Sequence, residues 1–142
     1  MNDFMKSIDT KLLGRRTYEA SLRLGAKFGG QDRTLVFSRQ APPTAAPSGV
    51  EFVRGDISAF VGGLRQQPGK DIWLMGGGDL IASFLDAHAI DEFVISMAPV
   101  FIGDGIPLIA RRHRDVPLEL ISSERFEDGL VQLRYRVIRS RP

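Results

Sequence analysis

The chain has 142 residues, a formal net charge of +2, 43% hydrophobic residues and 25% charged residues. A chain of this size and composition can build a substantial hydrophobic core, so we expect one globular domain over residues 1–142 rather than a disordered chain. Cysteine is absent, which excludes disulfides, thiolate catalysis and iron–sulfur clusters.

Other residue types narrow the function classes further. His88 and His113 are the only histidines, so a histidine-rich metal site and a Ser-His-Asp triad are disfavoured, and we expect no metal. We interpret His88 as structural or solvated and His113 as part of an exposed basic loop, with contact to an anionic substrate as the alternative. The net charge is weak for a nucleic-acid binder, and the longest apolar stretch, residues 93–102, is about half of a membrane span. We therefore expect a soluble, cytoplasmic protein with a small-molecule substrate and no nucleic-acid or membrane partner.

Apolar periodicity predicts strands that alternate with helices over about the first 95 residues. Strands are expected at residues 11–13, 33–38, 51–53, 71–75, 92–97 and 99–102. Helices are expected at residues 2–9, at residues 18–24, after the N-cap Asp56 and after the glycines at 76–78. Residues 118–126 and 130–138 flank a Glu-Asp-Gly turn, which predicts a closing antiparallel hairpin. The pattern predicts an α/β fold whose mostly parallel sheet carries antiparallel edge strands.

Three consecutive glycines, Gly76, Gly77 and Gly78, lie between a predicted strand and a predicted helix. Glycines at this point expose backbone N–H groups at the positive end of the helix, and a phosphate group suits that position. Ligands of open α/β sheets also bind at such strand ends. The alternative is a tight turn that requires positive φ. A standard Rossmann domain is disfavoured, because the sixth residue of a G-x-G-x-x-G fingerprint would be Ile81.

Two further predicted strand ends carry residues that suit an anion. The segment Gly-Arg-Arg-Thr at residues 14–17 offers two guanidiniums and a hydroxyl beside a helix N-terminus. The segment Ser-Arg at residues 38–39 ends another strand. The alternative for each arginine is a solvated surface charge. Together with the three glycines, these strand ends predict a ligand with several phosphates that bridges them.

Three segments resemble the dihydrofolate reductase-like superfamily. They are LLGRRTYE at residues 12–19, VFSR at residues 36–39 and WLMGGGDLIASFLDAHAIDEFVISMAPVFIGDGIPLI at residues 73–109. The triple glycine, the following Asp-Glu pair and the pattern P-V-x-x-G-x-G-x-P-L are similar to the C-terminal reductase domain of bacterial bifunctional deaminase-reductases of riboflavin biosynthesis. The resemblance covers nearly the whole chain. It implies a three-layer α/β/α fold with a mixed, mostly parallel central sheet, a C-terminal antiparallel hairpin and NADPH as cofactor.

The resemblance also implies which residues hold the cofactor. The segment at 14–17 would hold its phosphates, the segment at 38–39 would face the adenosine 2′-phosphate, and the glycines would back the pyrophosphate. The cofactor-binding residues implied in this way are Gly14, Arg15, Arg16, Thr17, Ser38, Arg39, Gly76, Gly77, Gly78, Asp79 and Leu80. No catalytic acid or base is nominated, because only geometry identifies such a group.

The sequence departs from this superfamily at its start. Members begin with a strand and a Ser-Leu-Asp-Gly-like loop before the first helix, and that strand is central in their sheet, whereas this sequence starts inside the helix. Either the sheet closes without this strand, or a partner supplies one, or the start codon is placed too late. The departure concerns the expected substrate site more than the cofactor site.

The sequence thus leads to a hypothesis and an alternative. The hypothesis is an NADPH-dependent reductase that transfers hydride to a pterin-like or ribosylaminopyrimidine substrate. The alternative is a non-catalytic, dimeric nucleotide-binding protein of the same fold. Unpaired strand edges and the apolar face of the last strand favour a homodimer, with the C-terminal hairpin and residues 111–116 as the expected contact. In a monomer, the N-terminal helix should instead pack over the seam through Phe4, Met5 and Ile8.

Overall fold

The computed structural model describes residues 2–30, 32–40, 46–112 and 115–139. The helices in these ranges are α1 (Asn2–Ser7), α2 (Arg15–Arg23), α3 (Ile57–Arg65) and α4 (Gly78–Asp86). The strands are β1 (Ile8–Gly14), β2 (Arg33–Phe37), β3 (Val50–Val53), β4 (Asp71–Gly76), β5 (Glu92–Met97), β6 (Leu118–Arg125) and β7 (Val131–Val137). Within the described ranges, no helix has the length and apolar character needed to cross a membrane.

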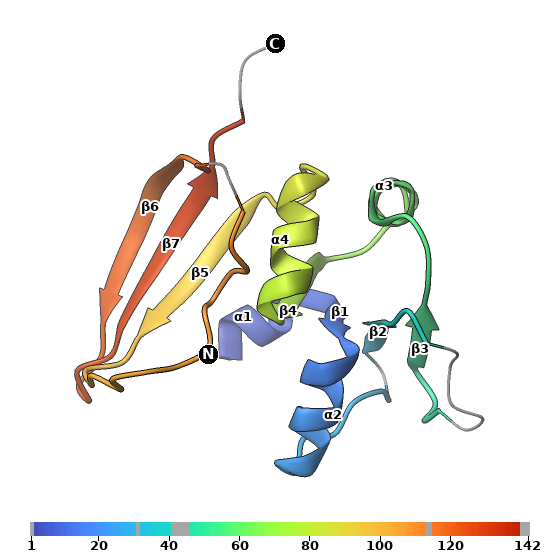
Figure 1. Cartoon of the computed structure of the whole chain (residues 1–142), viewed down its shortest axis with the longest axis horizontal. Coiled ribbons are helices and arrows are strands. Elements are labelled where there is room, and N and C mark those ends of the chain that lie inside the picture. Colours follow the sequence, from blue (N-terminus) through green and yellow to red (C-terminus); the bar gives the residue numbers. More distant parts are fainter. Residues whose placement is uncertain (1, 31, 41–45, 113–114, 140–142) are drawn as a thin grey trace.

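The strands form two sheets (Figure 1). Four parallel strands lie in the order β3-β2-β1-β4, and three antiparallel strands lie in the order β5-β7-β6. The α/β class, the parallel sheet and the C-terminal antiparallel hairpin are as the sequence predicts. The strands do not form one continuous sheet, however, because the outer edges of β4 and β5 have no strand partner among the described residues.

The first strand and the helix after it are both longer than predicted. β1 already begins at Ile8, inside the predicted first helix, because Ile8, Thr10 and Leu12 alternate as buried positions of a strand. α2 begins at Arg15 rather than at residue 18. The extended backbone of Gly14 serves as its N-cap, and arginine is a good helix former. The junction between strand and helix therefore takes no intervening loop.

The strand predicted at residues 99–102 is wrong, because this segment is irregular. Pro99 has no N–H to donate to a neighbouring strand. The N–H of Val100 donates instead to the carbonyl oxygen of Ala98 at 2.9 Å, which closes a tight turn. The side chain of Phe101 is fully exposed, so apolar packing does not hold the segment against a sheet.

The hydrophobic core lies on both faces of the parallel sheet. On one face, Leu12 and Leu35 pack with residues of α3 and α4. On the other face, Leu13 and Val36 pack with Tyr18 of α2. Neighbouring residues of a strand point to opposite faces, so each of these adjacent apolar pairs contributes to both layers. The result is the expected three-layer α/β/α arrangement around the parallel sheet.

α4 connects the two sheets and lies between them in Figure 1. Its buried residues include Ile81, Phe84 and Leu85, and these belong to the core on the α3 side of the parallel sheet. Phe93 of β5 and Val137 of β7 pack against the same cluster. The antiparallel sheet is therefore attached to the parallel sheet through α4 rather than through strand pairing.

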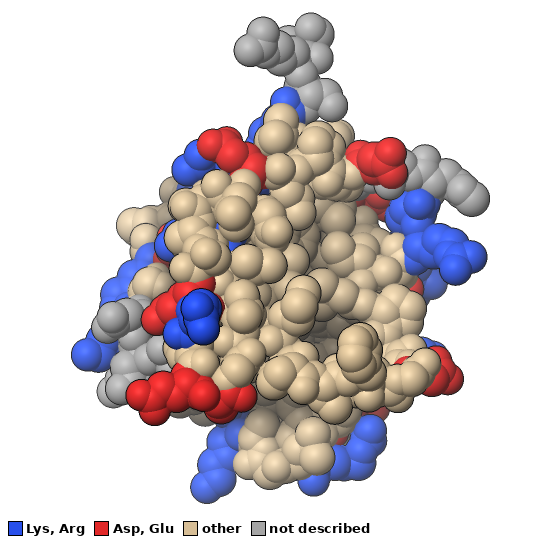
Figure 2. Space-filling model, turned by 90° about the vertical axis from the view of Figure 1, so that its left-hand side faces the viewer, with Lys and Arg blue, Asp and Glu red and all other residues tan. Residues whose placement is uncertain are grey.

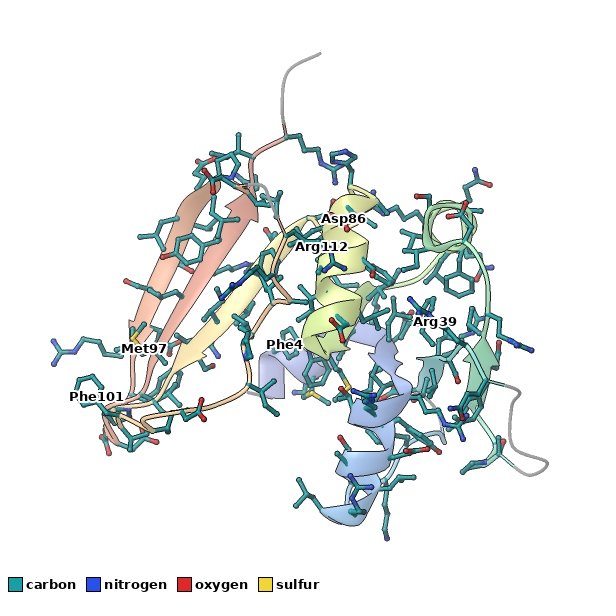
Figure 3. The ribbon with its side chains drawn as sticks, viewed as in Figure 1. Phe4, Arg39, Asp86, Met97, Phe101 and Arg112 are labelled. Atoms are coloured by element: carbon teal, nitrogen blue, oxygen red, sulfur yellow. The ribbon has the colours of Figure 1, made fainter. Side chains whose placement is uncertain are left out.

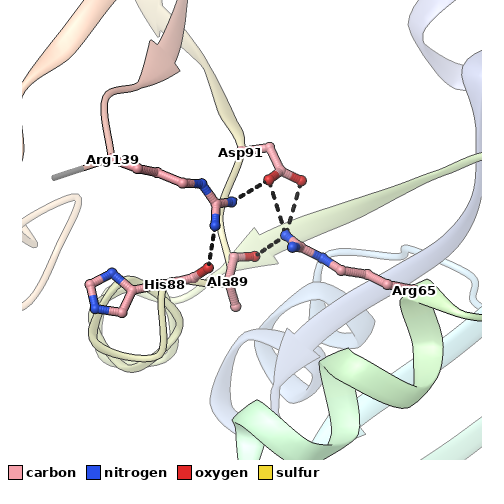
Figure 4. Close-up of polar contacts among 5 residues, drawn as sticks. All are labelled: Arg65, His88, Ala89, Asp91 and Arg139. Carbon is pink, nitrogen blue, oxygen red and sulfur yellow. Dashed lines mark hydrogen bonds and ion pairs between the residues drawn. The ribbon is translucent and has the colours of Figure 1, made fainter. Parts of the chain in front are cut away.

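One aromatic contact supports β4, and two ion pairs support the start of β5. The ring of Phe4 on α1 packs edge-on against Trp73 of β4, with 5.1 Å between the ring centroids. The Asp91 carboxylate, just before β5, pairs with Arg65 at the end of α3 (3.0 Å) and with Arg139 after β7 (2.6 Å), as Figure 4 shows. These ion pairs join the end of α3 to the end of the antiparallel sheet at which β5 begins and β7 stops.

Candidate functional site

The carboxyl ends of β2, β1 and β4 lie side by side at one edge of the parallel sheet. In the strand register Gly14 is opposite Phe37, and the residue before Gly14 is opposite Gly76. The Gly-Arg-Arg-Thr, Ser-Arg and triple-glycine segments therefore meet at this edge, as the strand pattern predicts. α2 and α4 both begin there. We refer to this region as the strand-end site.

The glycines of the strand-end site allow close approach between its two halves. A Cβ atom placed on Gly14 would lie 3.9 Å from both the carbonyl oxygen of Gly76 and the amide nitrogen of Gly77. A Cβ atom placed on Gly77 would lie only 3.1 Å from the hydroxyl oxygen of Thr17. Gly76 has a φ of +128°, which side chains strongly disfavour. Gly77 has a φ of −81°. A positive φ therefore explains why glycine occupies position 76, but it does not explain the glycine at position 77.

Both helices at the strand-end site begin without a side-chain cap. Gly14 is the N-cap of α2 and Gly77 is the N-cap of α4, and neither offers an oxygen to the first N–H groups. In α3, by contrast, the predicted N-cap Asp56 accepts a hydrogen bond from the backbone N–H of Ser58 at 2.8 Å. The first N–H groups of a helix have no intrahelical acceptor, and they carry its positive dipole end. Two such ends at one sheet edge suit an anion with more than one charged group.

Arg15 connects two of the strand ends. Its Nη1 donates a hydrogen bond to the hydroxyl of Ser38 at 3.4 Å, and its Nε pairs with Glu19, one helical turn along α2, at 2.9 Å. A guanidinium has five N–H donors, so these two contacts leave others for a ligand. Arg15 is half-buried, and its position is thus fixed from two sides.

The remaining predicted residues lie around Arg15 at the strand-end site. Arg16 and Arg39 are exposed, and Arg39 lies beyond the end of β2 (Figure 3). The backbone carbonyl oxygen of Arg39 accepts a hydrogen bond from Arg54 at 2.8 Å. Asp79 is exposed in the first turn of α4, where it stabilises the helix but adds negative charge. Leu80 packs against the hydrophobic core, so only its backbone could face a ligand.

Sequence reasoning did not assign the loop after β5 to the strand-end site. The backbone N–H of Ala110 donates to the carbonyl oxygen of Gly78 at 3.0 Å. A Cβ atom on Gly78 would meet the backbone oxygens of Pro107 at 3.0 Å and of Leu108 at 3.2 Å. Gly78 is therefore required by close packing against this loop. The P-L pair of the family pattern was the available signal, but the pattern alone does not reveal what the loop touches.

Two cavities in the described part of the chain lie away from the strand-end site, and none of the predicted site residues lines them. A small cavity of about 70 Å³, lined in part by His88, Asp115 and Arg139, lies at the other end of α4. His88 is exposed, and His113 lies outside the described residues. In the described ranges, no group of three or more His, Asp and Glu side chains could hold a metal ion. The donors at the strand-end site are thus helix N–H groups, guanidiniums and hydroxyls, which fit phosphate groups.

The chain is similar to several known proteins over most of its length. Residues 17–132 match the family model of the RibD C-terminal domain. The uncharacterized protein YwjB of Bacillus subtilis is 37% identical over 134 residues, which cover 94% of this chain and 76% of YwjB. A putative riboflavin biosynthesis protein from Shewanella sp. PV-4 is 27% identical and superimposes with a TM-score of 0.82, over 98% of this chain and 79% of that chain. Dihydrofolate reductase from Enterococcus faecalis, solved with NADP(H), has the same fold at 18% identity (TM-score 0.64, 96% and 81% covered).

Proposed function

The chain belongs to the RibD C-terminal domain family, and we propose that it is a cytoplasmic NADPH-dependent reductase. The cofactor would supply hydride to a C=N or C=O bond of a pterin-like or ribosylaminopyrimidine substrate. One observation carries the proposal: two uncapped helix N-termini and the half-buried Arg15 meet at adjacent strand ends. The Shewanella relative, which is described as a putative riboflavin biosynthesis protein, favours the ribosylaminopyrimidine class.

The residues of the strand-end site would divide the phosphates of NADPH between them. The N–H groups at the start of α4 and the Thr17 hydroxyl, which lies close to Gly77, suit the pyrophosphate. Arg15 and Arg16 would supply positive charge beside it. Ser38 and Arg39 would bind the adenosine 2′-phosphate, and Arg15, which donates a hydrogen bond to Ser38, would add positive charge beside it.

The proposal is tested by mixing the protein with NADPH and candidate ribosylaminopyrimidine or pterin substrates and following the loss of the NADPH absorbance band. We expect oxidation that depends on both the substrate and the protein. A Gly77→Val variant should lose this activity, since its side chain would crowd Thr17. Failure of every candidate substrate, with NADPH binding intact, would reject the reductase assignment.

Nucleotide binding without catalysis is the second candidate function. It is favoured by the division of the sheet, because β4 and β5 leave their outer edges unpaired in the described part of the chain. A substrate held between the two sheets would have an incomplete wall there. If the protein binds nucleotide without catalysis, NADPH should bind at the strand-end site and no substrate should accelerate its oxidation.

A further inference from the structure

The first turn of α2 carries charges that do not stabilise the helix. Arg15 and Arg16 occupy its first two positions, and the turn contains no acidic residue. Cations are unfavourable at the positive end of a helix dipole, where a carboxylate would be stabilising. The same positions suit an anion that approaches from outside the helix. A ligand therefore explains this charge pattern better than helix stability does.

Glu19 balances one of these charges. Its Oε1 accepts a hydrogen bond from Nε of Arg15 at 2.9 Å, and the Glu19 side chain is 47% exposed. Within the described residues Glu19 has no other hydrogen-bond or ion-pair partner. An arginine one turn before a glutamate is the less favourable order for such a pair in a helix. The pair therefore adds little to the stability of α2.

Other arginine–carboxylate pairs of this chain connect separate elements. Arg134 on β7, for example, pairs with Glu92 on the neighbouring strand β5 at 2.7 Å. Figure 2 shows the side of the molecule on which β6 lies, where acidic and basic side chains lie next to one another at several places. The Arg15–Glu19 pair connects no two elements, because both residues belong to α2. Attachment of one element to another therefore does not explain this pair.

The pair does set the direction of the Arg15 guanidinium. While Nε is held by Glu19, Nη1 donates to the hydroxyl of Ser38 at 3.4 Å. Contacts at two nitrogen atoms of one planar group restrict its rotation. Nη2 donates no hydrogen bond to the described residues, so its two N–H groups remain for a ligand. Without Glu19 the long side chain would lose one of its two contacts and gain rotamer freedom.

We propose that Glu19 is a positioning residue that makes the strand-end site prefer NADPH over NADH. This role rests on the proposed function, because it requires Arg15 and Ser38 to face the adenosine 2′-phosphate. Glu19 acts through Arg15 and does not itself contact the cofactor. A guanidinium that is already ordered loses less conformational entropy when the phosphate binds, so it binds the phosphate more tightly.

Net charge alone leads to the opposite expectation. Glu19 is negative, and a phosphate monoester adds roughly −1.5 to −2 charges to the cofactor. If Glu19 acted only through its charge, its removal would strengthen NADPH binding more than NADH binding. If Glu19 positions Arg15, its removal should weaken NADPH binding more than NADH binding. The two explanations therefore differ in the sign of the change.

Fluorescence titration of three variants with NADPH and with NADH separates these explanations. In Glu19→Ala we expect the preference for NADPH to fall about threefold or more, which is the effect of immobilising one long side chain on binding. Glu19→Gln retains an oxygen acceptor without the charge, so it should keep most of the preference. Glu51→Ala is the matched control, because Glu51 pairs with Arg33 at the start of β2, away from the strand-end site. This control should leave the preference unchanged.

Nitrogen-15 NMR of the cofactor-free protein measures the positioning itself. The Arg15 Nε–H should exchange slowly with water in the wild-type protein and in Glu19→Gln, and faster in Glu19→Ala. Unchanged exchange in Glu19→Ala would overturn the proposal. A preference for NADPH that stays constant or rises in Glu19→Ala would overturn it and leave the cofactor assignment intact. Equal affinity of the wild-type protein for NADPH and NADH would overturn both.

Discussion

Arg15 and Ser38 are 23 residues apart in sequence, yet the Arg15 guanidinium donates a hydrogen bond to the Ser38 hydroxyl at 3.4 Å. The contact exists because β1 and β2 are parallel neighbours that end at the same edge of the sheet. It joins the two segments that the sequence nominated separately for phosphate binding. A positively charged side chain is thereby held at the strand-end site before any ligand binds.

Replacing Arg15 should weaken NADPH binding. We expect Arg15→Ala to lower the affinity about tenfold or more, because a hydrogen bond to a charged group contributes roughly 1.5–3 kcal/mol. Arg23→Ala is the matched control, since Arg23 is on the last turn of the same helix and should leave the affinity unchanged. Fluorescence titration of both variants checks this. Equal losses in the two variants would mean that only general charge attracts the cofactor.

Gly77→Val should abolish cofactor binding and leave the protein folded. A Cβ atom at this position would lie 3.1 Å from the Thr17 hydroxyl, so the branched side chain must displace Thr17 and cover the start of α4. The φ of −81° is a value that residues with side chains commonly adopt, so the expected loss does not come from a positive φ. Cofactor titration together with thermal melting separates the two effects. If the variant bound NADPH normally, the glycines would serve as a turn only.

Replacement of two other glycines by alanine should change the stability of the protein in opposite directions. Gly62→Ala should stabilise the protein by up to about 1 kcal/mol, because Gly62 lies within α3 and a Cβ atom there meets open space. Gly76→Ala should destabilise it by about 1 kcal/mol or more, because its φ of +128° disfavours a side chain. Urea unfolding measures both changes. The same sign in both variants would contradict this account of the strand-to-helix junction.

Asp9 should make stability depend on pH in the acid range. The backbone N–H of Lys70 donates to its carboxylate at 2.8 Å, which holds the pKa of Asp9 below its usual value of 3.8, and the Thr10 hydroxyl adds a second hydrogen bond. A depressed pKa in the folded state stabilises the protein fully above the unfolded pKa, and this contribution is lost as pH falls through the folded pKa.

Asp9→Asn tests this coupling. The variant should be less stable than the wild type near neutral pH, and the difference should shrink once Asp9 is protonated in both the folded and unfolded states. Denaturant unfolding at several acid pH values measures the difference. A loss that stays constant down to the lowest pH would assign the effect to packing rather than to charge.

Much of the fold could be predicted because strand and helix patterns are local. The adjacent apolar pairs in β1 and β2 and the Asp56 cap are visible in the sequence and appear in the structure. The division into two sheets could not be predicted in the same way, because strand pairing depends on which edges meet. The irregular segment after Pro99 was misassigned, since its apolar residues favour a strand while the proline and a tight turn prevent one.

The meeting of the three motifs at one edge of the sheet was predictable, but the contacts between their residues were not. Parallel strands bring their carboxyl ends together, so three separate motifs could be expected to meet. The Arg15–Glu19 pair and the packing of the loop at Pro107 against Gly78 needed coordinates. Leu80 was included from the family pattern, and its side chain turns to the core because it belongs to the apolar stripe of α4.

The comparison of NADPH with NADH tests the central claim most directly, because the two cofactors differ only in the 2′-phosphate assigned to Ser38, Arg39 and Arg15. Titration of the wild-type protein should show NADPH binding about tenfold tighter or more, since one charge-assisted hydrogen bond already accounts for that ratio. The preference should shrink in Arg15→Ala and persist in Arg23→Ala. Equal affinity for the two cofactors in the wild-type protein would contradict the account.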